Sequence, residues 1–256
     1  MIARTAPVRQ RILITGASSG LGEQMARVWA SRGRDLALCA RRTADLERLR
    51  DELLTAHPER RVVVRALDVT DHDATAAVFA ECATELGGLD RVVANAGVGQ
   101  GGSIGTGRAE GNRMTALTNF VGVVNQAEAA VSIFRAADAG HFVIISSMAA
   151  LRGMGAHMNV YSASKAGVSA LGEGLRSDLW DTPIRVTTVH PGYIRTSLME
   201  SDPHLKFAVD VEAGTAAIID AVEREVPRAY VPRRPWAALA IPMRVLPLRV
   251  FRRMAG

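Results

Sequence analysis

The sequence predicts an α/β fold: a doubly wound parallel sheet of about seven strands, with helices on both faces, in a single domain spanning residues 1–256. Short β-rich runs alternate with longer helical patterns along the chain. This alternating order is typical of a parallel sheet covered on both faces, and right-handed crossovers make it doubly wound. The 256 residues, 48% hydrophobic and 22% charged, suit one ordinary domain and exclude wholesale disorder.

The first half of the chain contains four predicted strands. Arg11–Thr15 is an apolar run that leads into a glycine-rich turn, and Leu46, Leu49 and Leu53 recur at the spacing of one helical face. Asp71 marks a helix start, because acids suit the positive end of the helix dipole. The predicted elements are strands at 11–15, 36–40, 61–66 and 91–94, and helices at about 21–31, 44–56 and 71–86.

The second half continues the same alternation. The predicted elements are helices at about 110–136, 160–180 and 213–224, and strands at 141–146, 184–190 and 229–231. Two segments have no regular pattern. Gly97–Gly107 contains six glycines and is predicted to be a mobile loop, and Ser197–Asp210 could form a short lid.

Composition excludes several other classes of protein. The two cysteines, Cys39 and Cys82, cannot build a disulfide framework or a zinc site of the CxxC type. The histidines have no ligand spacing, so no metal is predicted. No apolar run is long enough to span a bilayer, and the first ten residues lack an apolar signal core, so we expect a cytoplasmic protein.

The net charge of +5 is unevenly distributed. Residues 228–256 contain seven arginines and no acid, so the rest of the chain carries slightly more acids than bases. This balance does not indicate a nucleic-acid-binding surface on the body of the protein.

The segment from Thr15 to Gly22 has the character of a phosphate-binding turn. It follows a predicted strand, opens a predicted helix and reads TGASSGLG. Glycines let the backbone turn tightly and let a pyrophosphate approach, while the helix N-terminus presents free N–H groups. A plain tight turn is the alternative, and the strand–turn–helix context favours the phosphate site.

The spacing TGxxxGxG resembles the short-chain dehydrogenase/reductase (SDR) family, and further family motifs follow in order over about residues 11–196. The resemblance implies a Rossmann-type fold that binds a nicotinamide dinucleotide. The residues that match the cofactor motifs are Gly16, Ser18, Ser19, Gly20, Leu21 and Gly22 in the turn, the adenine-contacting pair Asp68 and Val69, the Asn95-Ala96-Gly97 element, and Pro191, Gly192, Ile194 and Thr196 beside the nicotinamide.

Tyr161 and Lys165 form the family's YxxxK signature and are the predicted catalytic centre, where they also contact the cofactor. Four residues apart on one helix, they share a face. A lysine ammonium held nearby favours the phenolate and lowers the tyrosine pKa, which is otherwise near 10. Only two of the 31 basic residues are lysines, so a lysine at this position is not a random basic residue.

Ser147 and Asn119 complete the predicted catalytic set. The resemblance implies that Ser147 holds the substrate carbonyl oxygen, with Ser146 as the alternative, because the Ser147–Tyr161 spacing is one residue longer than the family's. It also implies that Asn119 opens its helix locally and holds a water in a proton relay to Lys165. A packed polar residue is the alternative for Asn119.

Arg41 and Arg42 follow the second predicted strand, where NAD-binding folds place an acid. No acid lies between Leu36 and Ala44, and an arginine can pair with a 2′-phosphate, which favours NADP over NAD. In an arginine-rich chain, ordinary surface charge is the alternative.

These observations predict an NADP-dependent enzyme that transfers a hydride between nicotinamide and a small-molecule carbonyl or secondary alcohol, on an apolar or lipid-like substrate. Tyr161 is the predicted general acid and base. A catalytically silent NADP-binding sensor or scaffold is the alternative, although such proteins usually lose the tyrosine or the lysine.

The C-terminal segment, residues 228–256, mixes arginines with large apolar residues, and Pro242 and Pro247 are predicted to break it into short helical pieces. Two interpretations remain open. The segment could lie on an anionic membrane surface as a peripheral contact, or pack on a sister subunit, since the resemblance implies a homodimer or homotetramer.

Overall fold

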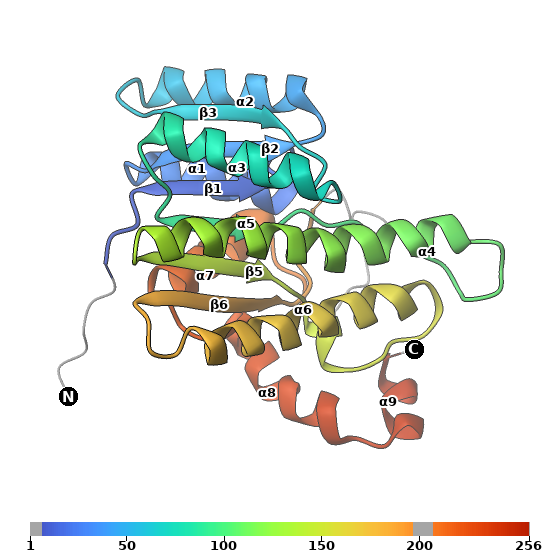
Figure 1. The fold of residues 1–256 in the computed structure, drawn as a ribbon. Helices are drawn as coiled ribbons and strands as arrows, with labels where there is room; N and C mark the ends of the chain where they lie inside the picture. Colours follow the sequence, from blue (N-terminus) through green and yellow to red (C-terminus); the bar gives the residue numbers. More distant parts are fainter. Residues whose placement is uncertain (1–6, 197–206, 256) are drawn as a thin grey trace.

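A single parallel sheet forms the centre of the molecule (Figure 1). The computed structural model describes residues 7–196 and 207–255. Seven strands pair in the order β3-β2-β1-β4-β5-β6-β7, and every pairing is parallel, which confirms the predicted fold class. The strands are β1 (Arg11–Thr15), β2 (Asp35–Ala40), β3 (Val62–Ala66), β4 (Arg91–Ala94), β5 (Gly140–Ile145), β6 (Ile184–Pro191) and β7 (Arg228–Val231).

The helices cover both faces of this sheet. In Figure 1, α3, α5 and α6 lie in front of it and α1 and α7 behind it. The helices are α1 (Gly20–Ser31), α2 (Thr43–Ala56), α3 (His72–Leu86), α4 (Ala109–Ala116), α5 (Gly122–Ala136), α6 (Asn159–Asp178), α7 (Val211–Glu223), α8 (Arg233–Val245) and α9 (Leu248–Ala255). Asp71 caps α3 by accepting a hydrogen bond from the Ala74 N–H, as its position suggested.

Alternate residues of each strand enter two separate cores. On β1, Ile12 and Ile14 pack with α1, α2 and α7, whereas Leu13 packs with the helices of the other face. Most side chains of the central strands are apolar on both sides because both faces are buried. The reversal of strand order between β1 and β4 opens a crevice at the carboxyl ends of these strands, where ligands bind in doubly wound sheets.

Two predicted segments differ from the observed structure. The predicted helix at 110–136 consists of α4, a π-helical turn over Leu117–Val121, and α5. Pro242 lies inside α8 and does not end it, because the helix is held on the body through Trp236 and Ala240. The predicted break at Pro247 is confirmed, since α8 ends at Val245 and α9 begins at Leu248. Of the proposed lid, residues 197–206 lie outside the described part of the chain.

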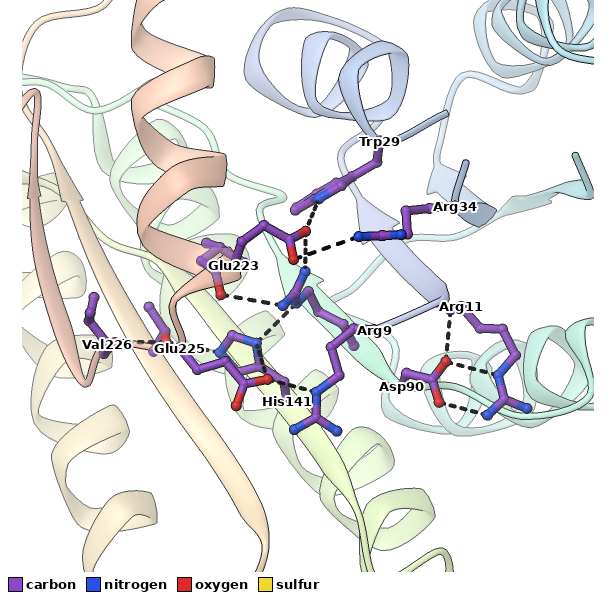
Figure 2. Close-up of polar contacts among 12 residues, drawn as sticks. Arg9, Arg11, Trp29, Arg34, Asp90, His141, Glu223, Glu225 and Val226 are labelled. Atoms are coloured by element: carbon purple, nitrogen blue, oxygen red, sulfur yellow. Dashed lines mark hydrogen bonds and ion pairs between the residues drawn. The ribbon is translucent and has the colours of Figure 1, made fainter. Parts of the chain in front are cut away.

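The amino ends of the strands hold a buried polar network (Figure 2). Arg91, the first residue of β4, has no exposed surface and donates to Glu223 Oε1 at 2.8 Å and to His141 Nδ1 at 3.0 Å. Glu223 also accepts from the Trp29 indole at 2.8 Å. Burial lowers the pKa of the Arg91 guanidinium, and Glu223 opposes that change. This acid therefore keeps a buried cation paired.

A second part of the network fixes the tautomer of His141. Because Nδ1 of His141 accepts from Arg91, its Nε2 carries the proton and donates to Thr187 Oγ1 at 2.9 Å. Burial and the nearby arginines hold the pKa of His141 well below its usual range. Arg9 pairs with Glu225 at 2.7 Å beside it. The sequence gives no sign of this cluster, because its members come from distant segments.

Replacing Glu223 tests the network. Glu223→Ala leaves the Arg91 guanidinium buried without its carboxylate, so we expect the free energy of unfolding to fall by about 3 kcal/mol in urea denaturation. The control is Glu110→Ala, which removes an exposed ion pair with Arg113 and should change the value by less than about 0.5 kcal/mol. Equal small changes in the two variants would contradict this account.

Candidate active site

The glycine turn after β1 is packed tightly on itself and on the end of β4, so that only glycine fits at two of its positions. Gly16 has φ +64°, and a Cβ there would lie 2.8 Å from the Ala96 Cα. A Cβ on Gly22 would lie 2.3 Å from the Gly16 carbonyl oxygen. Ser19, which precedes α1, makes no side-chain hydrogen bond to the helix, so the first N–H groups of α1 are not capped by it. The turn thus fits the pyrophosphate of a dinucleotide.

Asn95 braces this turn from the neighbouring strand. Its Nδ2 donates to the Thr15 carbonyl oxygen at 2.9 Å and to the Gly16 carbonyl oxygen at 3.3 Å. The Thr15 hydroxyl accepts from the N–H groups of Asn95 and Ala96, both at 3.1 Å. The ends of β1 and β4 are therefore joined by side chains on the floor of the crevice.

Thr196 faces the same turn from the segment after β6. A Cβ on Gly20 would lie 3.6 Å from the Thr196 Cβ. Ile194 is buried and pairs with Val209 in an isolated bridge, which fixes the start of this segment. The segments that follow the first and sixth strands thus lie next to each other at Gly20 and Thr196.

The two arginines after β2 are exposed and lie beside the turn. Arg42 donates to Ser19 Oγ at 3.0 Å and to Asp45 Oδ2 at 2.6 Å. Arg41 lies 4.0 Å from Asp68 Oδ2. No acid occurs at positions 36–44, but Asp45 in α2 pairs with Arg42, and Asp68 after β3 lies close to Arg41. These pairings did not follow from the sequence. Val69 lies buried next to Asp68.

Lys165 is held by the end of β5. Its ammonium is buried and donates to the Ile145 carbonyl oxygen at 2.9 Å. Its Nζ lies 5.8 Å from the centroid of the Tyr161 ring, so the two residues do share a face of α6. Burial lowers the pKa of Lys165 to about 8.

Tyr161 behaves differently from the expectation. In the polypeptide alone, burial raises the pKa of its phenol, and a hydrogen bond with Ser147 partly opposes that change. The expectation that Lys165 lowers the pKa of Tyr161 is wrong for the polypeptide alone. The Lys165 ammonium donates to a backbone carbonyl oxygen and not to the Tyr161 hydroxyl. Ser147, and not Lys165, is therefore the group that lowers the pKa of the phenol.

The geometry separates the two candidate serines. Ser146 is buried, and its Oγ donates to the Lys165 carbonyl oxygen at 3.0 Å. Ser147 begins a short 3-10 turn, Met148–Leu151, and accepts a hydrogen bond from the Ala149 N–H. Its hydroxyl lowers the pKa of Tyr161. A second 3-10 turn, Ala156–Met158, follows in the same loop. Ser147 thus lies at the site and Ser146 lies behind it.

Asn119 lies in the π-helical turn between α4 and α5. Its Oδ1 accepts from the Val98 N–H at 2.8 Å and its Nδ2 donates to the Val98 carbonyl oxygen at 2.9 Å. A Cβ on Gly97 would lie 3.2 Å from Asn119 Oδ1 and 3.5 Å from Lys165 Nζ. The local opening of the helix is thus observed, and Asn119 and Lys165 meet at Gly97. The water relay remains a prediction.

Two residues that the sequence analysis did not place in the site lie behind it. Trp236 of α8 packs so closely on the Pro191-Gly192 turn that a Cβ on Gly192 would lie 2.0 Å from its indole ring. His190 is buried, and its Nε2 lies 3.2 Å from Ser169 Oγ, which bonds in turn to the Lys165 carbonyl oxygen at 2.8 Å. Burial lowers the pKa of His190 to about 4. The position of His190 before Pro191-Gly192 in the sequence did not indicate its contact with Ser169.

Within the described residues, no group of three or more histidine, cysteine or acidic side chains could hold a metal ion. In residues 7–196 and 207–255 no helix has the length and apolar character needed to cross a bilayer.

Comparisons with known proteins agree with this geometry. Residues 10–205 match the family model for short chain dehydrogenase. An uncharacterized oxidoreductase of Mycobacterium tuberculosis is 47% identical over 98% of this chain and 99% of its own length. An uncharacterized oxidoreductase of Myxococcus xanthus is 41% identical over 73% of this chain and 72% of its own length.

A solved short-chain dehydrogenase from Sphingobium yanoikuyae in complex with NADPH is 30% identical, with a TM-score of 0.79 over 91% of this chain and 92% of that chain. The glycine crevice, the tyrosine–lysine pair and the match over most of the sequence lead to one conclusion: this chain belongs to the short-chain dehydrogenase family and is an oxidoreductase acting on CH–OH and C=O groups.

Proposed function

We propose that the protein is an NADP-dependent oxidoreductase that interconverts a carbonyl and a secondary alcohol, with Tyr161 as the general acid and base. The observation that carries the proposal is that Tyr161 lies beside buried Lys165, with Nζ 5.8 Å from its ring centroid, while the Ser147 hydroxyl lowers the pKa of its phenol. When bound, the dinucleotide supplies the hydride donor or acceptor.

The chain's own residues move the proton. In reduction, the Tyr161 hydroxyl gives its proton to the oxygen of the forming alkoxide, and in oxidation it takes the proton back. Ser147 donates a hydrogen bond to the same oxygen and stabilises its developing charge. With a pKa of about 8, Lys165 is charged near neutrality yet close to the point of releasing its proton, which suits it to replace the one that Tyr161 gives up.

The preference for NADP is supported by Arg42 and Arg41. Arg42 already contacts Ser19 of the glycine turn, so its guanidinium lies where an adenosine 2′-phosphate would reach the rim of the crevice. The neighbouring Asp45 holds the guanidinium in this place. The NADPH complex of the Sphingobium relative is consistent with this choice.

An apolar substrate is supported by the side chains next to Ser147 and the Pro191-Gly192 turn. Buried Met148, Trp236 and Ala240 form one cluster there, with partly buried Leu151 and Tyr193 packed against it. The partly buried Leu151 and Tyr193 on the outside of this cluster offer apolar surface, which favours an aliphatic or lipid-like carbonyl compound over a charged one.

Tyr161→Phe tests the acid–base role. We expect kcat/KM for NADPH-dependent carbonyl reduction to fall by roughly 10²–10⁴-fold, because the variant has no proton to give. Thr55→Val removes an exposed hydroxyl at the end of α2 and serves as the control. NADPH binding, measured by thermal shift, should survive in both variants. Unchanged turnover in Tyr161→Phe would refute the mechanism, and no turnover of any carbonyl by the wild type would favour the silent-sensor alternative.

Arg42→Gln tests the cofactor preference. Losing one charged hydrogen-bonding partner should weaken NADPH binding by roughly 10–100-fold and leave NADH binding nearly unchanged, as measured by fluorescence titration. Arg48→Gln is the control, because Arg48 also pairs with Asp45 but follows later in α2. Equal losses for the two dinucleotides would speak against a 2′-phosphate contact.

Lys165→Met should separate stability from activity. Burial holds the pKa of the folded lysine at about 8, below the unfolded value, so the charged form destabilises the fold at pH 7. The variant should lose activity and gain up to about 3 kcal/mol in the free energy of unfolding at pH 7, less the cost of leaving the Ile145 carbonyl oxygen without its donor.

The pH dependence gives the same test a second readout. Between pH 8 and about 10.4 the unfolded chain binds more protons at this residue, so wild-type stability should rise with pH over that range. This rise should vanish in Lys165→Met and persist in Lys206→Met, the only other lysine substitution available. A rise that persists in Lys165→Met would assign it to another group.

A further inference from the structure

Exposed apolar side chains gather where α8 meets α9. Ile241, Val245, Leu248 and Val250 are 70%, 71%, 63% and 44% exposed. They are four of the ten large exposed hydrophobic residues in the described chain, within ten consecutive positions. We name this group the tail patch. In Figure 1, α8 and α9 project from the body below α6, on the side to which the strands point.

Unpaired cations surround the tail patch. Arg244, Arg249, Arg252 and Arg253 are exposed, and none of them takes part in an ion pair between described residues. No acid occurs after Glu225. Most exposed arginines on the body, such as Arg48 and Arg113, have a carboxylate nearby. The hairpin of α8 and α9 therefore combines apolar and uncompensated basic side chains on one surface.

The hairpin is anchored on the body rather than loosely attached. Arg152, from the loop after Ser147, donates to the carbonyl oxygens of Arg244 at 3.3 Å and Leu246 at 2.5 Å, which satisfies the end of α8. The same guanidinium lies 5.4 Å from the ring centroid of buried Phe251. With Phe251 turned inward and Arg152 holding the turn, the tail patch is directed outward.

A hollow of about 550 Å³ lies next to the hairpin. Leu248 of the tail patch lines it, together with the loop at 150–155 and the first turns of α6. The tail patch is therefore close to the loop that carries Ser147, so a surface that binds it would lie near the site.

Charge decides which occupant fits the tail patch. A two-fold contact between two copies of the hairpin would bring their arginines together with no carboxylate on either hairpin, which is unfavourable. An anionic phospholipid surface provides phosphates for the arginines and an apolar layer for the aliphatic side chains. We propose that the α8–α9 hairpin binds the surface of an anionic phospholipid bilayer, with the tail patch inserted at headgroup depth and the four arginines paired with lipid phosphates.

Vesicle sedimentation of the full chain tests this proposal. The protein should sediment with vesicles of phosphatidylcholine and phosphatidylglycerol but not with phosphatidylcholine alone, and added salt should weaken the binding. Arg249→Gln/Arg252→Gln/Arg253→Gln should reduce binding by roughly 100-fold. Leu248→Ser should also reduce it, through loss of apolar insertion.

Matched controls use exposed residues elsewhere on the body. Arg32→Gln/Arg113→Gln/Arg185→Gln removes the same charge, and Ile104→Ser removes an apolar side chain that is 67% exposed. Both should bind vesicles as the wild type does, and all variants should keep the wild-type thermal shift with NADPH. If the control variant with three arginines replaced bound vesicles as weakly as the hairpin variant does, net charge alone would explain the binding, and the proposal would be overturned.

Light scattering distinguishes the sister-subunit alternative. If the wild type fails to bind anionic vesicles and Leu248→Ser lowers its molar mass in solution, the hairpin is an interface between copies and the membrane proposal is wrong. Failure to bind vesicles with no change in mass would overturn it as well. Because vesicle binding needs no carbonyl substrate, either result is independent of the proposed reaction.

Discussion

Lys165 is held at both ends by two consecutive residues, and the active site depends on that arrangement. The Lys165 ammonium donates a hydrogen bond to the Ile145 carbonyl oxygen, and the Lys165 backbone carbonyl oxygen accepts one from the Ser146 hydroxyl. Ser169 and His190 extend this contact to β6. Ile145 and Ser146 thus fix the position of α6 relative to β5, and Tyr161 is held close to Ser147 as a consequence. A buried ammonium is tolerated there because a carbonyl dipole faces it.

The fold followed largely from local pattern. Each predicted strand lies within one residue of the observed one, because every strand is a short apolar run between polar turns. The π-helical turn at Asn119 did not follow in detail, since it depends on the backbone of Val98, which lies beyond the helix itself. The helical path through Pro242 likewise depends on how α8 packs, through Trp236 and Ala240, on Met148.

The site was predictable where it consists of motifs and unpredictable where it consists of contacts between motifs. The glycine turn, Tyr161 and Lys165 have fixed spacings in the sequence. The choice between Ser146 and Ser147 needed the direction of each hydroxyl, and the pKa of Tyr161 needed the direction of the Lys165 ammonium. The pairing of Arg42 with Asp45 and the packing of Trp236 on Gly192 also arise only after folding.

The network at the amino ends of the strands has a consequence for biosynthesis. Arg91 is buried against Glu223, and Arg9 pairs with Glu225, so residues made early in translation find their partners only in the last part of the chain. Until Glu223 of α7 has been made, Arg91 has no carboxylate partner, and the amino end of β4 cannot be buried without burying an unpaired cation. Burial of this end of β4 is therefore a late event in folding, because it joins residues that are 132 positions apart in the chain.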